Sequence, residues 1–326
     1  MLCMMDISQS KQNITCGVPQ GSILGPLLFL LYINDIANVS SILFAILFAD
    51  DTNSLASGSN LQQLTESVNG ELEKIVIWLA ANKLSLNIKK THFMVFCSKG
   101  KKINGPISIK ISNQEIEQVN HTKFLGVIID DKLNWSYHIK SIKNKVAKGI
   151  GVMCKARKLL NKNTLITLYY SFIYPHLHYG ILAWGNTYTS LLDPIIKMQK
   201  RAIRMISKAS RNAPTEPLFN ELKLLNLANI YILNVMIFMQ KIHHGVLPDV
   251  FGNMFVLNSD IHGYYTRQSN KIHSPPRRLE IVRRSIRIQG TEFWNMMMYI
   301  IDHKCSPASY KCHMKRHLLG NKLDIS

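Results

Sequence analysis

The sequence of 326 residues predicts an α+β front half followed by a mostly helical back half. Three patterns lead to this prediction. Two strand-like runs flank Asp50 and Asp51, an amphipathic helix and short strand-like runs follow them, and helical spacing dominates after Trp135. A chain of this length can bury about three quarters of its unfolded surface. We therefore expect about two domains that need neither a disulfide nor a structural metal to fold.

The first expected elements are a helix and a pair of strands. Turn-forming residues fill positions 17–25, and Pro26 stands where a helix commonly begins. Residues 41–49 are almost continuously apolar, Asp50 and Asp51 interrupt the run, and a second strand-like run covers residues 52–56. This pattern predicts strand, tight turn and strand, with a buried sheet and a polar tip.

The next segment combines one helix with three short strands. Apolar residues recur at three- and four-residue steps from Leu61 to Leu79, with Ser59 or Asn60 as the helix cap. Strand-like runs follow at residues 92–97, 107–111 and 124–129. This order predicts an α+β layer rather than a parallel βαβ sandwich.

Helical spacing governs the rest of the chain. After Trp135, apolar side chains step at helical intervals from Ile139 to Met153. We expect further helices at about residues 165–174, 191–206 and 309–319, and over 216–243 with a break near Asn226. Residues 258–290 are rich in Pro and basic residues and are expected to be irregular.

The formal net charge of +19 is distributed unevenly. Residues 1–134 hold eleven basic and eleven acidic side chains, whereas residues 135–326 hold 28 basic and 9 acidic ones. Such asymmetry predicts a polyanionic partner that is bound mainly by the back half.

Nothing in the sequence predicts secretion or membrane insertion. The first residues lack the apolar core of a signal peptide, residues 39–49 are too short to span a bilayer, and residues 165–184 contain Pro175, His176 and His178. The six cysteines follow no framework spacing, so we expect reduced thiols inside the cell. The sequence does not decide between nucleus and cytoplasm.

The most informative residues are Phe48-Ala49-Asp50-Asp51. Two adjacent carboxylates on an apolar hairpin repel each other and cost desolvation free energy. Asp at a loop tip can serve turn geometry alone. Hard oxygen ligands on a rigid hairpin also suit Mg²⁺, which prefers carboxylate and phosphate oxygens.

A second motif stands thirty residues upstream and favours the functional interpretation. It reads Gly17-Val18-Pro19-Gln20-Gly21-Ser22 and is followed by Leu24-Gly25-Pro26. Glycines before a helix let the backbone approach a phosphate or a base closely, because no Cβ stands in the way. Gln20 adds a donor and an acceptor at that surface.

Together these motifs resemble the reverse transcriptases of non-LTR retrotransposons, most closely those of jockey-like elements. Residues 86–91 are similar to the family's N-x-x-K-T motif, and Phe124-Leu125-Gly126-Val127 is similar to its F-L-G hairpin. A looser similarity covers residues 265–267 and 290–295. The resemblance extends over nearly the whole chain.

The resemblance implies a fold and a function. Residues 1–134 would form a partial polymerase palm, in which helices pack on an antiparallel sheet. Residues 135–211 would form a basic helical thumb, and residues 212–326 a helical and irregular C-terminal region. The implied activity is RNA-directed DNA polymerisation by two-metal nucleotidyl transfer. Its partners would be an RNA template, a DNA primer, deoxynucleoside triphosphates and Mg²⁺.

The resemblance also assigns roles to individual residues. Asp50 would be the principal metal ligand with Asp51 beside it, and Lys90 would lie near the nucleotide's phosphates. The template and incoming nucleotide would be contacted by Gly17, Pro19, Gln20, Gly21 and Ser22, and the primer end by Phe124, Leu125 and Gly126. The basic residues expected to contact nucleic-acid phosphates are Lys140, Lys143, Lys145, Lys148, Lys155, Arg157, Lys158, Lys200, Arg201 and Arg204.

One departure from the family pattern affects the expected activity. Family members carry another catalytic Asp on a palm strand upstream of the Gln-Gly motif, whereas here only Asp6 precedes Gly17. Neighbouring strand residues face opposite ways, so Asp50 and Asp51 cannot easily both bridge two metal ions. We therefore expect an N-terminally truncated copy without fingers, an incomplete Mg²⁺ site, and little activity from this chain alone.

Several alternatives stay open. The chain could be a non-catalytic nucleic-acid-binding remnant, or a group II intron-type maturase of the same polymerase clan. The spacing of His303, Cys305, Cys312, His313 and His317 matches no standard zinc pattern, and no zinc is expected. The oligomeric state is left open.

Overall fold

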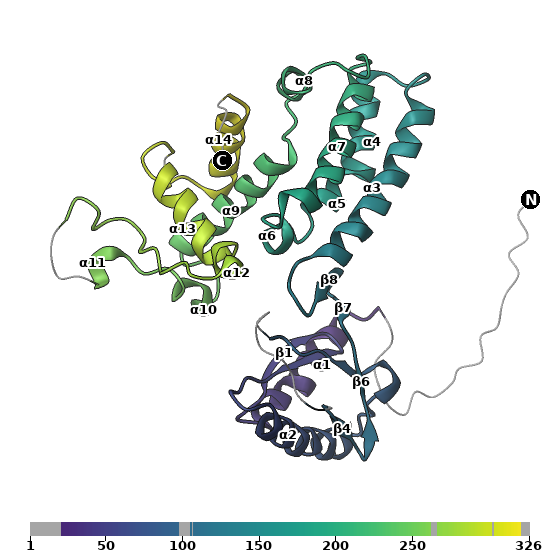
Figure 1. Ribbon diagram of the computed structural model, residues 1–326, viewed down its shortest axis with the longest axis vertical. Helices are drawn as coiled ribbons and strands as arrows, with labels where there is room; N and C mark the ends of the chain where they lie inside the picture. The colour runs from purple at the N-terminus through teal and green to yellow at the C-terminus, as the bar shows by residue number, and fades with distance from the viewer. Residues whose placement is uncertain (1–20, 98–104, 106, 262–265, 302, 321–326) are drawn as a thin grey trace, which may run out of the picture. The chain divides into compact units, whose positions relative to one another are not determined.

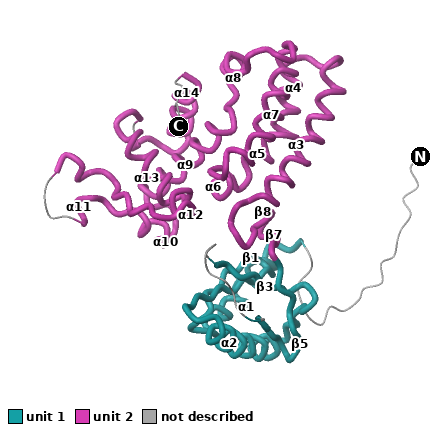
Figure 2. The backbone as a smooth tube through the Cα atoms, viewed as in Figure 1, with its two compact units in different colours: residues 1–119 teal, residues 120–326 magenta. Residues whose placement is uncertain are grey.

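The computed structural model of the chain describes residues 21–97, 105, 107–261, 266–301 and 303–320. It divides into two compact units, Met1–Val119 and Asn120–Ser326 (Figure 2). The division lies earlier in the chain than residue 134, because the hairpin after Asn120 packs on the first helix of unit 2.

Unit 1 contains the expected hairpin between two helices. α1 (Leu24–Ile33) and the 3-10 helix η1 (Asn34–Asn38) precede β1 (Phe44–Phe48) and β2 (Asp51–Leu55), which pair antiparallel. α2 (Leu61–Ala81) begins after Asn60, whose side-chain oxygen accepts the backbone N–H groups of Gln62 and Gln63. The structure therefore selects Asn60 over Ser59 as the cap.

The remaining elements of unit 1 are short. They are the 3-10 helix η2 (Ile88–Lys90) and the two-residue strands β3 (His92–Phe93), β4 (Lys110–Ile111), β5 (Gln114–Glu115) and β6 (Glu117–Gln118). β3 pairs parallel with β6, and β4 pairs antiparallel with β5. A small core forms where Ile109, Ile111 and Ile116 meet the apolar face of α2.

The prediction of a buried sheet was wrong for β1 and β2. Phe44 is 66% exposed and Phe48 59% exposed, and within the described part of unit 1 no third strand pairs with this hairpin. Residues 92–97 and 107–111 were also expected to form longer strands than β3 and β4. Backbone pairing is limited there to two residues per strand.

Unit 2 opens with a hairpin and a helical bundle (Figure 1). β7 (His121–Phe124) pairs antiparallel with β8 (Val127–Asp130), and the long helix α3 (Ser136–Ala156) follows. α3 packs against α4 (Lys162–Phe172) and α7 (Thr189–Ile206). The short helices α5 (Tyr174–His178) and α6 (Ile181–Trp184) follow α4 in the chain and precede α7. The apolar stripe predicted from Ile139 to Met153 is buried in this bundle.

The expectation of one strand over residues 124–129 was wrong. Leu125 and Gly126 both have positive φ angles, of 45° and 84°, so the chain reverses there and separates β7 from β8. A two-residue turn of this kind matches the right-handed twist of the flanking strands.

The second half of unit 2 is built around one buried helix. α8 (Glu216–Glu221) ends before α9 (Leu227–His243), and the Asn226 side chain caps α9, so the predicted break is confirmed. α13 (Ile286–Met297) and α14 (Pro307–Gly320) pack against α9. In the described part of the predicted irregular segment 258–290, the one-turn helices α11 (Asn258–Ile261) and α12 (Glu280–Arg283) are joined by irregular chain, and the first residues of α13 extend into its end. The short helix α10 (Asp249–Gly252) precedes this segment.

A single large core extends through unit 2. It includes the fully buried Trp184, Leu165 and Met236. None of the helices in the described ranges combines the length and the apolar character that crossing a bilayer requires.

Candidate functional site

The two aspartates lie at the tip of the β1–β2 hairpin. Phe48 pairs with Asp51, which leaves Ala49 and Asp50 as the two-residue turn, with Ala49 at a φ of 51°. Both carboxylates are exposed. The sequence prediction of strand, turn and strand with Asp50 at the tip is confirmed.

This tip alone does not complete a two-ion metal site. Two bound Mg²⁺ ions that act on one phosphoryl group need shared carboxylate ligands from separate elements. The hairpin supplies two neighbouring carboxylates, and within the described residues no three His, Cys, Asp or Glu side chains lie together so that they could hold a metal ion. The carboxylates of Asp50 and Asp51 could therefore supply some, but not all, of the ligands of a two-ion Mg²⁺ site.

The Gln-Gly motif is described only from Gly21 onward; Gly17, Pro19 and Gln20 lie outside the described residues. Gly21 has a φ of 90°, which L side chains rarely adopt, and the space around its Cα is open. The Ser22 hydroxyl oxygen accepts the backbone N–H of Gly25 at 3.0 Å. Ser22 therefore stabilises the start of α1, a role that the sequence motif did not predict.

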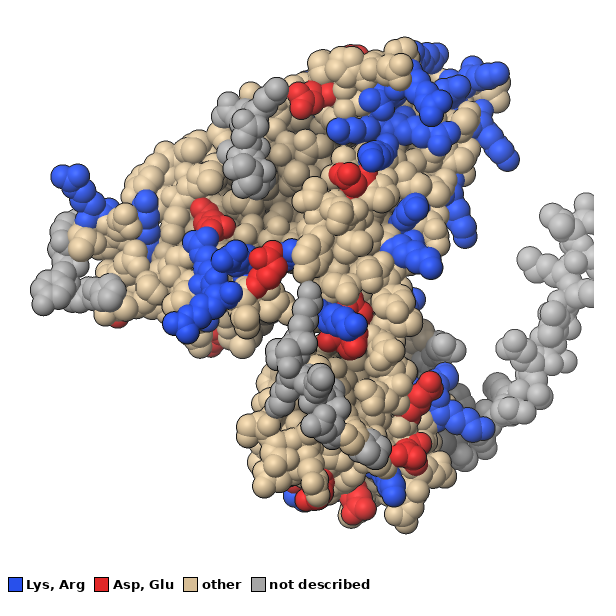
Figure 3. Space-filling model, in the orientation of Figure 1, with Lys and Arg blue, Asp and Glu red and all other residues tan. Residues whose placement is uncertain are grey.

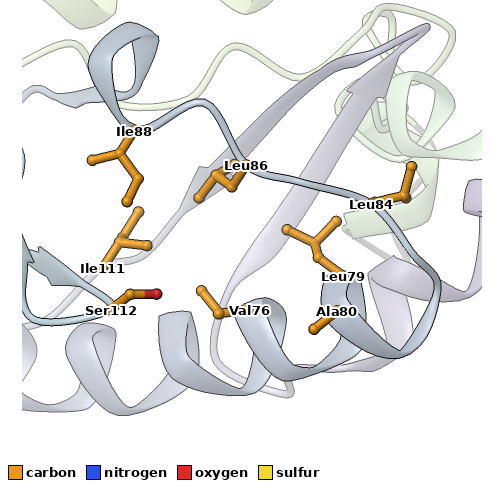
Figure 4. Close-up of a pocket in the computed structure, with 8 residues that line it drawn as sticks. All are labelled: Val76, Leu79, Ala80, Leu84, Leu86, Ile88, Ile111 and Ser112. Carbon is orange, nitrogen blue, oxygen red and sulfur yellow. The ribbon is translucent and has the colours of Figure 1, made fainter.

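Lys90 stands at the end of η2, and its side chain is exposed. Two sets of contacts hold the turn. Ile88 lies with Leu86, Val76 and Ile111 around a small apolar pocket (Figure 4). The Asn87 carbonyl oxygen accepts the backbone N–H of Lys90 and the Thr91 hydroxyl, both at 3.0 Å. Thus Asn87 and Thr91 fix the backbone that presents Lys90.

The three residues predicted to contact a primer end lie together on the β7–β8 hairpin. Phe124 ends β7, and Leu125 and Gly126 form the turn; all three are half-buried. Sequence reasoning missed Asp130 at the end of β8. Its buried carboxylate accepts the backbone N–H groups of Lys132, Asn134 and Trp135, and thereby joins the hairpin to the start of α3. An Asp just before a helical stripe is the signal that could have revealed it.

The basic residues gather on unit 2 over the region of α3, α4 and α7 (Figure 3). On α3 the lysines face solvent, opposite the buried stripe that contains Ile142 and Val146. The exposed members of the predicted set are Lys140, Lys143, Lys145, Lys148, Lys155, Arg157, Lys158, Lys200 and Arg201. Arg204 is half-buried, and its Nε donates a hydrogen bond to the Ala213 carbonyl at 2.8 Å. Part of the Arg204 guanidinium group therefore stabilises the fold through this bond and does not face solvent freely.

His243 on α9 and His303 both pack against Trp294 of α13. The His303 ring stacks on Trp294 with 4.4 Å between ring centroids, and the Met298 carbonyl lies 2.8 Å from its Nε2. Burial lowers the pKa of nearby His243, and the neighbouring rings of His244 and His303 lower it further.

Comparisons with known proteins identify relatives of the chain. The family described as reverse transcriptase (RNA-dependent DNA polymerase) matches residues 1–129. A probable RNA-directed DNA polymerase from transposon X-element of Drosophila melanogaster is 28% identical over 223 residues, which are 66% of this chain and 24% of that protein. The RNA-directed DNA polymerase from mobile element jockey of the same species is 26% identical over 283 residues, 81% of this chain and 30% of that protein.

A third relative is the retrovirus-related Pol polyprotein from type-1 retrotransposable element R1 2 of Nasonia vitripennis, 26% identical over 66% of this chain and 57% of that protein. The chain spans about a quarter of the length of the X-element protein and under a third of the jockey protein. No solved structure matches the chain. Residues 1–129 thus belong to the reverse transcriptase family, and most of the chain is similar to the RNA-directed DNA polymerases of non-LTR retrotransposons such as jockey.

Proposed function

We propose that this chain supplies the catalytic hairpin and the thumb of an RNA-directed DNA polymerase. In that reaction the primer 3′-hydroxyl oxygen bonds to the α-phosphorus of a deoxynucleoside triphosphate, and pyrophosphate leaves. The observation that carries the proposal is the position of Asp50 at the tip of a rigid two-residue turn, with Asp51 beside it and both carboxylates exposed.

Each of the other predicted regions has a role in this proposal. Asp50 and Asp51 supply part of the Mg²⁺ ligands, and the family's general use of Mg²⁺ supports this assignment. Gly17, Pro19, Gln20, Gly21 and Ser22 contact the template and the nucleotide, and Lys90 faces the nucleotide's phosphates. The turn of the β7–β8 hairpin contacts the primer end, and the exposed lysines of α3 contact backbone phosphates.

The ligand count of the hairpin predicts that residues 1–326 alone do not extend a primer. The decisive experiment fuses the upstream polymerase segment of a jockey-type relative to Met1 and measures primer extension on an RNA template with Mg²⁺ and deoxynucleotides. We expect extension by the fusion protein and its loss in Asp50→Asn, because a metal ligand is removed. Asp35→Asn, the same change at another exposed acid of unit 1, is the control.

A second candidate function is nucleic-acid binding without catalysis. The net charge of +19, all of it in residues 135–326, favours this candidate for the chain by itself. The same fusion experiment separates the two functions. A fusion protein that binds primer–template tightly but does not extend it would support the binding function and contradict the polymerase. The relatives named above are proteins of mobile elements, which favours both candidates over an intron maturase.

A further inference from the structure

The turn of the β7–β8 hairpin is covered by one tyrosine from a distant part of the chain. A methyl group added at Gly126 would lie 3.1 Å from Cε1 of Tyr179, so the tyrosine ring rests directly on the turn. The Tyr179 hydroxyl donates a hydrogen bond to the carbonyl oxygen of Leu125, the other turn residue. One side chain thus contacts both residues of the turn.

Tyr179 is itself held by the core of unit 2. The indole Nε1 of Trp184 donates a hydrogen bond to the Tyr179 backbone carbonyl at 2.9 Å, and Trp184 is fully buried. Gly180 follows with a φ of 63°, and a Cβ there would lie 2.8 Å from Cγ2 of Val127. The junction between α5 and α6 therefore approaches the hairpin so closely that residue 180 has no room for a side chain.

Tyr179 is largely exposed, so its contact with the turn contributes little to the free energy of unfolding of the whole unit. Its side chain is 55% exposed, whereas Trp184 beneath it is 0% exposed. A half-covered ring contributes little buried apolar area to the fold. What the ring and hydroxyl do is restrict the orientation of the Leu125–Gly126 turn.

We propose that Tyr179 is a positioning residue that holds the β7–β8 turn in one orientation, so that the turn meets the primer 3′ end in register. The proposal rests on the proposed role of this turn at the primer end. Tyr179 lies outside the motifs named above. Its proposed role is to set the position of the primer 3′ end on the turn, and it contributes little to the affinity for the primer–template. The bulk of the binding free energy comes from the basic face.

The test compares Tyr179→Phe with Tyr170→Phe in the full chain. Tyr179→Phe keeps the ring on Gly126 and removes only the hydroxyl, while Tyr170 is a partly exposed tyrosine on α4, away from the hairpin. Hydrogen exchange of the amides of residues 126–128 is the first measurement. Loss of one hydrogen bond should speed this exchange about fivefold in Tyr179→Phe and leave it unchanged in Tyr170→Phe. Equal exchange in all three proteins would overturn the proposal.

The second measurement is photocrosslinking from a 4-thiothymidine at the 3′ terminus of a DNA primer annealed to an RNA template. In the unmodified chain we expect crosslinks to residues 124–127. Tyr179→Phe should lower their yield about fivefold while the dissociation constant for the primer–template changes less than about twofold. A parallel fall in overall affinity would contradict a positioning role.

The two measurements fail independently. If exchange responds to Tyr179→Phe but the unmodified chain gives no crosslink at the hairpin, the proposed role of this turn at the primer end is wrong. If crosslinks form at the hairpin but neither exchange nor yield responds to Tyr179→Phe, the primer contact stands and the positioning role of Tyr179 is wrong.

Discussion

The imidazole of His138 accepts the backbone N–H of Ile128 through Nδ1 at 3.2 Å, and this bond joins α3 to β8. Accepting at Nδ1 requires a neutral ring with its proton on Nε2, and Nε2 is buried without a hydrogen-bond partner among the described residues. Burial lowers the pKa of His138 to about 4, and the positive charge of Lys145 contributes to the shift. The hairpin is thus attached through a base that must stay uncharged.

The stability of unit 2 should therefore fall in mild acid. The unfolded chain takes up a proton at His138 near pH 6.5, while the folded protein resists protonation until about pH 4. The free energy of unfolding should decrease across this window by up to about 3 kcal/mol. In His138→Asn, whose Oδ1 replaces the Nδ1 acceptor without titrating, urea unfolding should depend less on pH. Identical pH profiles of the two proteins would contradict this.

Two glycines of α3 should respond in opposite ways to the same substitution. A Cβ at Gly149 would lie 2.7 Å from the Phe172 carbonyl oxygen, so Gly149→Ala should push α4 away and cost about 1–3 kcal/mol. Gly151 has open space around its Cα, so Gly151→Ala should stabilise the helix by about 0.5–1 kcal/mol. Thermal unfolding of both variants measures the difference, and a neutral Gly149→Ala would refute the close α3–α4 contact.

Nucleic-acid affinity should depend steeply on salt and should map to residues 135–211. Replacing Lys143 and Lys148 together by Gln should reduce the slope of log K against log[salt] by roughly 1.5, the value for two lost phosphate contacts. Lys241→Gln, a change of one exposed lysine on α9, should leave the slope unchanged. Affinity that resides in residues 1–134, or that salt does not weaken, would exclude this surface.

In the extended fusion protein, Lys90 and Asp51 should contribute less than Asp50. Lys90→Ala should lower kcat about 10²-fold and leave residual extension, as expected when a group acts on charge or a proton in the transition state. Lys89→Ala, at the neighbouring exposed lysine, is the control. Asp51→Asn should reduce extension less than Asp50→Ala, since Asp51 begins a strand and Asp50 lies in the turn. Single-turnover kinetics measures both losses, and a slower extension rate in Asp51→Asn than in Asp50→Ala would contradict the prediction.

The apolar face of α1 should limit the solubility of the chain expressed alone. Leu24 is 62% exposed and Leu31 68% exposed, and Phe44 and Phe48 of the β1–β2 hairpin are exposed as well. Replacing both leucines by Gln should raise the concentration at which light scattering begins. Ile33→Gln, at a buried position of the same helix, should instead destabilise unit 1. A monodisperse unmodified chain at high concentration would show that this surface is harmless.

The sequence predicted the local elements well because their signals are local. Apolar spacing located α2 and α3, Asn60 and Asn226 marked helix starts, and two aspartates marked the tip of a hairpin. Each of these features depends on residues within a few positions of one another.

The features that the sequence did not predict depend on distant residues. The bond from Tyr179 to Leu125 joins positions 54 residues apart, and no periodicity or spacing announces it. The exposure of Phe44 and Phe48 could not be foreseen either, because an apolar strand has the same sequence pattern whether or not another layer packs on its face. The apolar pattern of residues 124–129 did not reveal the turn at Leu125, since a non-glycine residue with positive φ is uncommon, whereas the similarity to the F-L-G hairpin did predict it.

In α3 the residues that the fold requires and the residues proposed to bind nucleic acid occupy different positions in the sequence. The buried stripe fixes the bundle, while lysines such as Lys143 and Lys148 make no contact that the core requires. A mutation of an exposed lysine should change the folding free energy by no more than about 0.5 kcal/mol. Descendant copies of the element can therefore lose or gain positive charge by drift, and vary in their hold on nucleic acid, long before the bundle itself decays.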